Sequence, residues 1–539
     1  MKKLLKVLMA ALMAVSLAAC GGGNDTGDKT TFTYAVGGEP EYLDPAVGQD
    51  SVTSLVTNQL HYPLVRIDET GNAVKEAAAD IVQGRNAKGQ MTYTVTLIDG
   101  LKWSNGDAVT AEHFEYGVKR AIGLGAADSY YSYFIFNFVE NAKKHSDNMS
   151  DVAKMDDLGC EATDEKTLVF TLSTDCPYFE QLMAAGVFYA AHPDYYKEHD
   201  KTWAEDVNAP VTGAYYPTKI DRNAEIVMKK NPIFVHADKV VTENVIAKIM
   251  KDMDAQNMAF KTKEIDMATS VNTSVQKEYS EAEGLYVSTS IINYFMLLDS
   301  YDKDCVALQD KEIRRAIALG IDRSVIASAL DAGDVYYALN GFVPKGFPGA
   351  DTTKDFREEG GDLVYTDKAA AKATMEAKGY TADKPLQLEY YYNQSALHDT
   401  VAAVLKEELK SINVDLKLKT GEVRTFFDDR DNGIFQTARH AMSADYMDTT
   451  CYLDMAHKAN QKAYRSWGDA HYDKLMDEAV KLSGAERINK LHEAEKYLVE
   501  EMSYCIPLMQ YDQVSLLRPG ITGAMTSPQA NFTFWYIAK

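Results

Sequence analysis

Residues that could catalyse a reaction do not fall into the spacings that known chemistries need. Residues 84–90 have the glycine spacing of a phosphate-binding loop but lack its lysine and following hydroxyl residue. Gly123-Leu124-Gly125 is followed by Asp128 where a dinucleotide-binding turn needs a third glycine. The sequence contains no Gly-x-Ser-x-Gly and no His-Glu-x-x-His segment, and its 11 histidines are scattered without ligand spacing. These patterns argue against an enzyme, and they predict no cofactor and no metal site.

The residues before Cys20 indicate that this cysteine is chemically modified. Lys2 and Lys3 precede an apolar run over residues 4–17, which ends in Leu17-Ala18-Ala19-Cys20. This order is typical of a secretory signal, and the run is shorter than the ~20 apolar residues that span a membrane. A cysteine directly after Leu-Ala-Ala looks like a bacterial lipobox, whose thiol receives diacylglycerol. We therefore expect a signal peptide over residues 1–19 and lipidation of Cys20. The alternative is a simple secreted protein in which Cys20 is incidental.

The chain after Cys20 predicts a flexible tether followed by several lobes. Residues 20–30 are rich in glycine and polar residues and have little to bury. The net charge is −23, and it becomes about −26 once the three lysines of the signal are removed. Such acidity argues against nucleic acid as a partner and against binding to an anionic membrane surface. The five remaining cysteines have no metal spacing and cannot all pair with one another, and no pairing is predicted for Cys160, Cys176, Cys305, Cys451 and Cys505.

Apolar periodicity predicts alternating helices and strands, and therefore an α/β or α+β class with mixed sheets. A helix opens at Asp310, with apolar residues at helical spacing up to Ile321. A second apolar stripe runs from Val401 to Ile412, and Thr110 caps a third helix. Further helices are expected between about residues 472 and 502. Strands are expected at residues 93–97, 168–172, 414–418 and 514–517.

Several blocks, taken in order along the chain, resemble one known family. The blocks are Asp44-Pro45, residues 61–65, residues 101–114, residues 211–215, Lys230-Asn231-Pro232, Glu264-Ile265-Asp266, residues 313–323, Ala444-Asp445-Tyr446 and Ile506-Pro507-Leu508. Together they resemble the bacterial extracellular solute-binding proteins of the oligopeptide, dipeptide and nickel class, which serve ABC importers. The likeness is greatest to the oligopeptide-binding proteins. Trp103, Gly106 and Thr110 are expected to build a strand–turn–helix corner. Arg314, Arg315, Asp322 and Arg323 are expected to hold a helix and its neighbours together through ion pairs.

The resemblance also implies which residues bind the ligand. A receptor for peptides of any sequence must hold an extended backbone, an ammonium group and a carboxylate. The resemblance gives the ammonium to Asp445, and it places Arg439, Arg430 and His398 on the carboxylate side. Arg439 and Asp445 are six residues apart, which is about 20 Å along a regular strand with both on one face.

Four further residues correspond to ligand-lining residues of the family. Tyr130 resembles a tyrosine that contacts the ligand, with core packing as the alternative. Three residues depart from the family pattern, because Met442 and Val423 stand where tryptophans are common and Ser443 stands where a cysteine is found. Since methionine adapts its shape, we expect larger or softer side-chain pockets. Peptide length and side-chain preference therefore stay open.

The resemblance implies an α/β, periplasmic-binding-protein-like fold of two large lobes with a hinge and an extra inserted lobe. The expected boundaries are residues 31–66 with 186–290 and 509–539 for lobe I, 67–185 for the inserted lobe II, and 291–508 for lobe III. Such a protein, expected to be a monomer, captures short peptides between its lobes and delivers them to an ABC permease with its ATPase subunits. Its only membrane contact is the lipid anchor, on the outer face of the bacterial cytoplasmic membrane.

Three alternatives remain at this point. The same fold could hold a nickel chelate, an oligosaccharide or another small solute. A catalytic triad assembled from distant segments leaves no sequence pattern, so a secreted hydrolase is a second alternative. The third is a peptide-signal sensor or a surface adhesin built on the same receptor.

Overall fold

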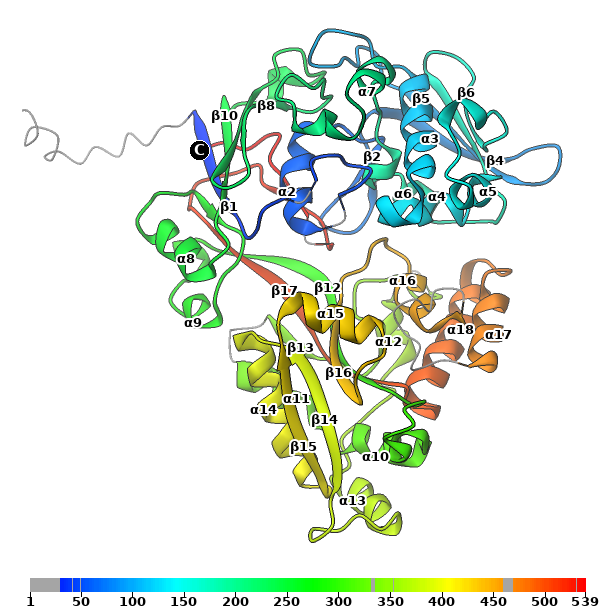
Figure 1. The fold of residues 1–539 in the computed structure, drawn as a ribbon, viewed down its shortest axis with the longest axis vertical. Coiled ribbons are helices and arrows are strands. Elements are labelled where there is room, and N and C mark those ends of the chain that lie inside the picture. The colour runs from blue at the N-terminus through cyan, green and yellow to red at the C-terminus, as the bar shows by residue number, and fades with distance from the viewer. Residues whose placement is uncertain are drawn as a thin grey trace, which may run out of the picture.

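The computed structural model describes residues 30–539 apart from 41, 49, 331–334, 352, 459–468 and 530. The expected signal peptide, Cys20 and all but the last residue of the expected tether lie outside the described residues. Figure 1 shows an upper and a lower body, with the C-terminus beside β1 (Thr31–Val36) in the upper one.

One mixed sheet of 11 strands runs through both bodies and connects them. Its main path is β15-β14-β16-β12-β17-β11-β1-β10-β9-β8, with β13 paired to β17. The long strands β12 (Leu285–Leu298) and β17 (Cys505–Leu517) pass from the upper body into the lower one (Figure 1). They pair antiparallel with a register shift between Ser288 and Ile292. The other strands are β8 (Tyr215–Asp221), β9 (Glu225–Lys230), β10 (Asn244–Ile249), β11 (Met267–Ala268), β13 (Tyr336–Ala338), β14 (Leu386–Asn393), β15 (Val414–Gly421) and β16 (Thr437–Met442).

A second, four-stranded sheet lies in the upper body with the order β4-β5-β7-β6. Its strands and the helix beside it are β4 (Ala78–Arg85), β5 (Met91–Leu97), β6 (Cys160–Ala162), β7 (Thr167–Thr171) and α3 (Ala111–Asp128). The predicted strands at 93–97 and 168–172 are confirmed to within about two residues at either end. This sheet falls within the expected inserted lobe, whose boundaries stay a prediction. The short pair β2 (Val65–Ile67) and β3 (Ala73–Lys75) leads into it.

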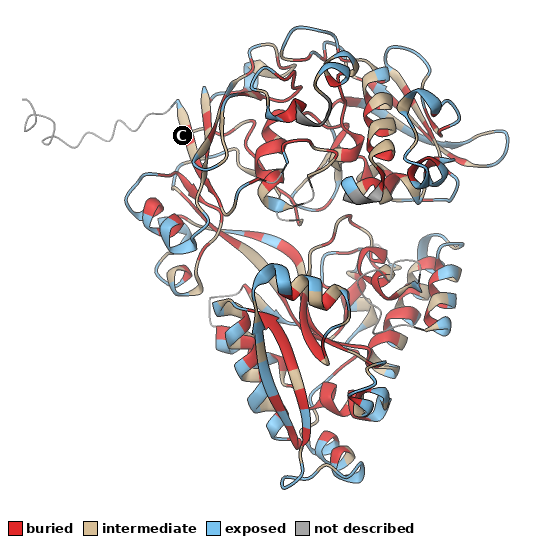
Figure 2. Cartoon of the chain, in the orientation of Figure 1, coloured by how far each residue is buried: buried red, intermediate tan, exposed pale blue. Residues whose placement is uncertain are grey.

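Helices cover the outside of both bodies, and their outward faces are exposed whereas the strands of the main sheet are largely buried (Figure 2). The upper body contains α2 (Ser51–Leu60), α4 (Tyr133–Phe136), α5 (Ala142–Asp147), α6 (Phe179–Leu182), α7 (Pro193–His199), α8 (Met253–Lys261) and α9 (Thr273–Gln276). The lower body contains α10 (Lys311–Leu319), α11 (Arg323–Leu330), α12 (Phe356–Gly360), α13 (Lys368–Ala377), α14 (Ala396–Lys410), α15 (Val423–Asp431), α16 (Thr450–Leu453), α17 (Ala470–Ala479) and α18 (Gly484–Lys496). The expected α/β class is confirmed.

The helices predicted in the lower body are present, but their ends differ from the apolar stripes. α10 begins after Asp310, whose side chain accepts the Glu312 N–H, and it ends before the buried Ile321. The stripe from Val401 extends to Ile412, yet α14 ends at Lys410. Ile321 and Ile412 are nevertheless fully buried, and the Ile412 side chain lies against Gly320 at the end of α10. The last strand is also longer than predicted, because β17 begins at Cys505.

Arg314 and Arg323 do stabilise the lower body, but the expected ion pairs were wrong. Arg314 donates from Nε and Nη2 to the Met502 carbonyl at 3.0 and 2.7 Å. Arg323 Nε donates to the Pro507 carbonyl at 2.7 Å. Both side chains are buried, and a planar guanidinium with five donors suits several main-chain carbonyls at once.

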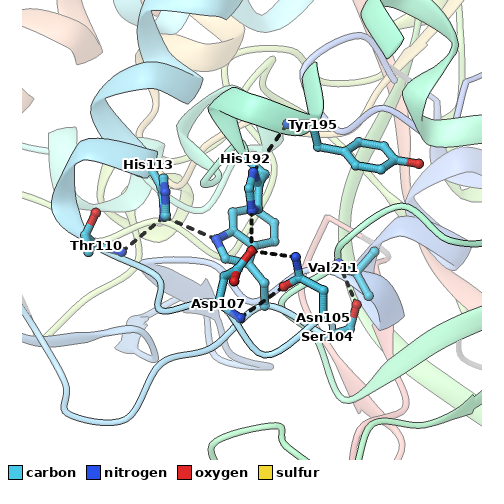
Figure 3. Close-up of polar contacts among 9 residues, drawn as sticks. Ser104, Asn105, Asp107, Thr110, His113, His192, Tyr195 and Val211 are labelled. Carbon is cyan, nitrogen blue, oxygen red and sulfur yellow. Dashed lines mark hydrogen bonds and ion pairs between the residues drawn. The ribbon is translucent and has the colours of Figure 1, made fainter. Parts of the chain in front are cut away.

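The segment around Trp103 forms the expected corner, drawn in Figure 3. His113 Nδ1 accepts hydrogen bonds from Trp103 Nε1 and from the Thr110 N–H, both at 3.2 Å. His192 lies in ring contact with His113 and binds Asp107 Oδ2 through Nε2 at 3.0 Å. Burial, helped by His192, lowers the pKa of His113 to about 4, so its imidazole is neutral at pH 7. These side chains hold the turn before α3, which is a structural role.

The buried pair of Glu495 and Arg357 generates a stability prediction. Glu495 is fully buried, and its Oε1 accepts the Phe342 and Val343 N–H groups at 2.7 and 2.8 Å as well as Arg357. Replacing Glu495 with alanine leaves a buried guanidinium without its carboxylate, which costs about 3–5 kcal/mol. We expect Glu495→Ala to lower the unfolding temperature of the lower body markedly in calorimetry.

The matched control is Asp99→Ala, which removes an exposed carboxylate bound to Lys166. Exposed ion pairs contribute little, so this variant should melt like the unchanged protein. Equal melting temperatures for Glu495→Ala and Asp99→Ala would contradict the role given to the buried pair.

Candidate binding site

Asp445 lies on a loop of the lower body that reaches the upper one. β16 ends at Met442, so the regular strand that would have carried Asp445 stops three residues before it. The Asp445 N–H donates to Cys451 Sγ at 3.0 Å, which holds the loop. Two residues on, the Met447 N–H donates to Gln181 Oε1 at 3.0 Å. Gln181 belongs to α6 of the upper body, so the loop joins the two bodies.

The carboxylate of Asp445 is held by tyrosines of the opposite body. The hydroxyl of Tyr133 donates to Oδ2 at 2.9 Å, and that of Tyr131 lies 3.3 Å from Oδ1. Burial raises the pKa of Asp445, whereas the two tyrosine hydrogen bonds act in the lowering direction. Among the described residues, no lysine, arginine or histidine lies within ion-pair distance of this carboxylate. Within the described part of the chain, Asp445 is therefore a partly buried acid without a countercharge.

A cavity of about 300 Å³ lies where Asp445 meets the upper body. The lower body contributes Ser443, Ala444 and Asp445 to its wall. The upper body contributes the polar face of α2, the aromatic residues Tyr131, Phe134, Tyr189 and Trp535, and a hairpin of β18 (Met525–Thr526) and β19 (Phe532–Thr533). Both bodies are thus needed to form this cavity.

Arg439, Arg430 and His398 lie in the lower body and do not line this cavity. Arg439 is buried, with Nε 2.7 Å from Asn393 Oδ1 and its guanidinium 5.0 Å from the Phe426 ring centroid. No described carboxylate pairs with Arg439. Arg430, in contrast, donates from Nε and Nη2 to its neighbour Asp431 at 2.9 and 2.8 Å.

His398 is neutral at physiological pH, which bears on its expected role. Its Nδ1 lies 3.2 Å from the Tyr294 hydroxyl, and it is buried in the first turn of α14. Burial, with a smaller contribution from Arg439, lowers the pKa of His398 to about 3. This imidazole can exchange a hydrogen bond with a carboxylate but offers it no charge.

The remaining predicted residues are spread over the site and its surroundings. Ser443 lines the cavity, and its Oγ is buried without a partner among the described residues. Met442 is partly buried at the end of β16, and Val423 is half exposed at the start of α15. Tyr130 falls in a short helical turn, and its side chain lies outside the described part of the structure. Of the predicted residues, only Asp445 and Ser443 line the cavity, and the others whose side chains are described lie elsewhere in the lower body.

Sequence reasoning missed three parts of the site: the tyrosines that hold Asp445, the polar face of α2 and the β18–β19 hairpin. Tyr131 and Tyr133 lie beside the predicted Tyr130, and the tyrosine-rich segment was the signal that could have indicated them. The polar face of α2 and the β18–β19 hairpin had no sequence signal, because they become neighbours of Asp445 only in the folded chain.

The described residues contain no group of three or more His, Cys, Asp or Glu side chains placed to hold a metal ion. No described helix is long and apolar enough to cross a membrane. The five described cysteines are buried and unpaired.

Two bodies joined by long strands, with a cavity between them, define a solute-binding protein of the hinged, two-lobed class. A sequence profile described as "Bacterial extracellular solute-binding proteins, family 5 Middle" matches residues 77–464, which is most of the chain. The chain therefore belongs to this family. Membership confirms the resemblance seen in the sequence, and it also confirms that the protein is a binding protein rather than an enzyme.

Individual relatives are similar over nearly the whole chain. The dipeptide-binding protein DppE of Bacillus subtilis is 27% identical over 496 residues, covering 91% of this chain and 88% of DppE. A probable deoxycholate-binding periplasmic protein of Escherichia coli, YgiS, is 26% identical over 496 residues, which cover 91% of this chain and 90% of YgiS. The solved structure of the Escherichia coli murein tripeptide-binding protein MppA superposes with a TM-score of 0.78 at 24% identity. The superposition covers 95% of this chain and 99% of MppA. That likeness confirms the two-lobed fold with an extra domain.

The low pKa of His398 generates a prediction. We expect the ring resonance of His398 to keep the chemical shift of a neutral imidazole from pH 5 to pH 8, because burial holds its pKa near 3. Proton NMR of the histidine region measures this, with the resonance assigned by its disappearance in His398→Asn. A histidine-containing tripeptide in the same buffer is the control. Titration of the His398 resonance near pH 6.5 would contradict the buried, neutral state.

Proposed function

We propose that this protein captures short peptides between its two bodies and that Asp445 binds their N-terminal ammonium group. The observation that carries the proposal is the Asp445 carboxylate, which is partly buried at the junction and has no described countercharge. A carboxylate removed from water without a cation is costly, and a ligand ammonium in the cavity would remove that cost.

The tyrosines around Asp445 support an oriented site. Hydroxyls of Tyr131 and Tyr133 donate to different carboxylate oxygens and fix the plane of the group. Each carboxylate oxygen can accept more than one hydrogen bond, so the group still has capacity for an ammonium. The aromatic walls of the cavity, among them Phe134 and Trp535, suit the apolar parts of a peptide.

Arg439 is the best candidate for the peptide carboxylate. It is buried and lacks a described acidic partner, whereas Arg430 already binds Asp431 and His398 is neutral. Six residues separate Arg439 from Asp445, so their main-chain separation is at most about 20 Å. That limit suits the two ends of a short peptide.

The alternative occupant is a non-peptide solute, since the similar protein YgiS is named for deoxycholate. Deoxycholate is an anion without an ammonium group, and its carboxylate would be repelled by Asp445. The unpaired acid in the cavity therefore favours a cationic end group, which every peptide with a free N-terminus has.

The proposal also covers the membrane anchor, the cellular location and the transport partner of this protein. We propose that Cys20 carries a lipid anchor, that the protein acts outside the cytoplasmic membrane, and that its loaded form meets an ABC permease. The homologues that are named as periplasmic binding proteins support the location. The lobe boundaries near residues 67, 186, 291 and 509 are proposed on the same basis, and the passage of β12 and β17 between the bodies supports the last two.

Removing the Asp445 carboxylate tests the proposal directly. We expect Asp445→Ala to weaken binding of an unmodified tripeptide such as Ala-Ala-Ala by about 30-fold or more, because a buried charge pair is lost. Isothermal titration calorimetry measures this. The matched control is Asp299→Ala, which removes another carboxyl whose pKa is raised by burial but which does not line the cavity. Equal peptide affinity in the two variants would contradict the ammonium site.

The raised pKa of Asp445 also predicts a pH dependence of binding. An ammonium binds the ionised carboxylate, so protonation of Asp445 competes with the peptide. The affinity should be constant above the raised pKa and should fall by up to about tenfold per pH unit below it. Titrations between pH 4 and pH 7 would show this slope in the unchanged protein, and Asp445→Asn should lack it. The same slope in Asp445→Asn would assign the titration to another group.

A further inference from the structure

The cavity wall contains hydrogen-bonding atoms that the described residues leave unsatisfied. Ser527 Oγ, Gln529 Oε1 and Ser443 Oγ are each buried and have no partner among the described residues. All three residues line the cavity that contains Asp445. Ser527 is only 5% exposed, so its hydroxyl is directed away from bulk solvent. Buried polar atoms are nearly always paired, so each of these three atoms calls for a partner that the described residues do not supply.

The hairpin that carries Ser527 and Gln529 is firmly held. The Ser527 N–H donates to the Asn531 carbonyl at 3.2 Å across the hairpin. The carbonyl of Pro528, between the two polar residues, accepts the Ile291 N–H of β12 at 3.2 Å. Farther along, the Phe532 carbonyl accepts from Gln59 of α2 at 3.2 Å. The unsatisfied atoms are therefore fixed between α2 and the strand that connects the two bodies.

The charged side chains of this cavity, apart from Asp445, already have partners. Asp50 caps α2 by accepting the Thr53 N–H at 2.8 Å and the Thr53 hydroxyl at 2.7 Å. Arg66 Nε is 3.1 Å from Glu76 Oε1. The groups left for a ligand, besides the Asp445 carboxylate, are hydroxyls and a carboxamide oxygen. These groups are uncharged. The hydroxyls can donate and accept hydrogen bonds, whereas the carboxamide oxygen only accepts them.

We propose that Ser527, with Gln529 and Ser443, forms a subsite for an uncharged polar side chain of the peptide, a hydroxyl or a carboxamide. Ser443 is two residues from Asp445 and lines the same cavity, which places this subsite next to the peptide's N-terminal end. A polar side chain gives these unpaired atoms hydrogen-bond partners, whereas an apolar side chain of the same shape leaves them unpaired. The receptor thus prefers serine, threonine, asparagine or glutamine in its first or second ligand position.

This inference rests on the proposed peptide function, and matched peptides separate the two. Threonine and valine have nearly the same shape and differ by a hydroxyl, so we would titrate Thr-Ala-Ala against Val-Ala-Ala and Ala-Thr-Ala against Ala-Val-Ala. Asparagine and leucine peptides extend the comparison to the carboxamide. A net hydrogen bond to a buried group corresponds to roughly a 3- to 10-fold difference in affinity. We expect the unchanged protein to prefer the polar member by that factor at one of the two positions.

The Ser527→Ala variant assigns the preference to the hairpin. We expect its affinity for the threonine peptide to fall to that for the valine peptide, so that the preference drops below twofold. The matched control is Ser515→Ala, since Ser515 is also a buried serine with an unpartnered Oγ but does not line the cavity. This control should keep the full preference. Gln529→Met provides a second test of the subsite on a partly exposed residue, should Ser527→Ala melt early in circular dichroism.

Three results would overturn the subsite, and only one of them would also overturn the proposed peptide function. If the unchanged protein binds all of these peptides but without a polar preference, the subsite is wrong and the peptide function stands. If the preference persists in both Ser527→Ala and Gln529→Met, it arises elsewhere in the cavity and the subsite is again wrong. If the unchanged protein binds none of the peptides, the proposed function itself fails and the subsite fails with it.

Discussion

A carboxylate is held at the junction of the two bodies, and no cation among the described residues pairs with it. Asp445 reaches the upper body on a loop of the lower one, and Tyr131 and Tyr133 orient it from the other side. Burying a negative charge costs free energy unless a positive group pairs with it. Under the proposed function Asp445 also binds the ligand, and ligand binding would then be coupled to contact between the bodies.

The rest of the fold maintains that junction. β12 and β17 are the long connection between the bodies, and their register shift near Ser288 interrupts the regular ladder where the chain passes between them. Beside Asp445, the rings of Tyr178 and Tyr446 stack at 4.9 Å between centroids, which adds an aromatic contact across the junction. The β18–β19 hairpin contacts β12 through Pro528, so one wall of the cavity is attached to the connecting strands. Relative movement of the bodies would thus change the shape of the cavity directly.

The sequence predicted the fold class and the family well, because both depend on local patterns and on short ordered motifs. Thr110, Asp310 and the apolar stripe from Val401 marked helices that the structure contains. The errors at Ile321 and Ile412 arose because an apolar residue just beyond a helix end can be buried as fully as one within the helix. Arg314 and Arg323 were correctly given structural roles, but sequence cannot show that their partners are main-chain carbonyls.

The binding site was predicted less completely for the same reason. Asp445 and Ser443 were named from a motif and lie at the cavity, whereas Ser527 and the face of α2 come from distant segments that only tertiary folding brings together. The charge state of His398 depends on burial, and Arg430 is paired with Asp431; no spacing rule shows either.

The most direct test of the central claim is the chemical identity of what the receptor binds when it is purified. Protein comprising residues 30–539 would be isolated without added ligand and denatured, and the released material would be analysed by mass spectrometry. The account predicts a mixture of short peptides with free N-termini, and much less of it in protein carrying Asp445→Ala. A single non-peptide compound, or the same peptide mixture at the same yield from Asp445→Ala, would contradict the role of Asp445 as the ammonium site.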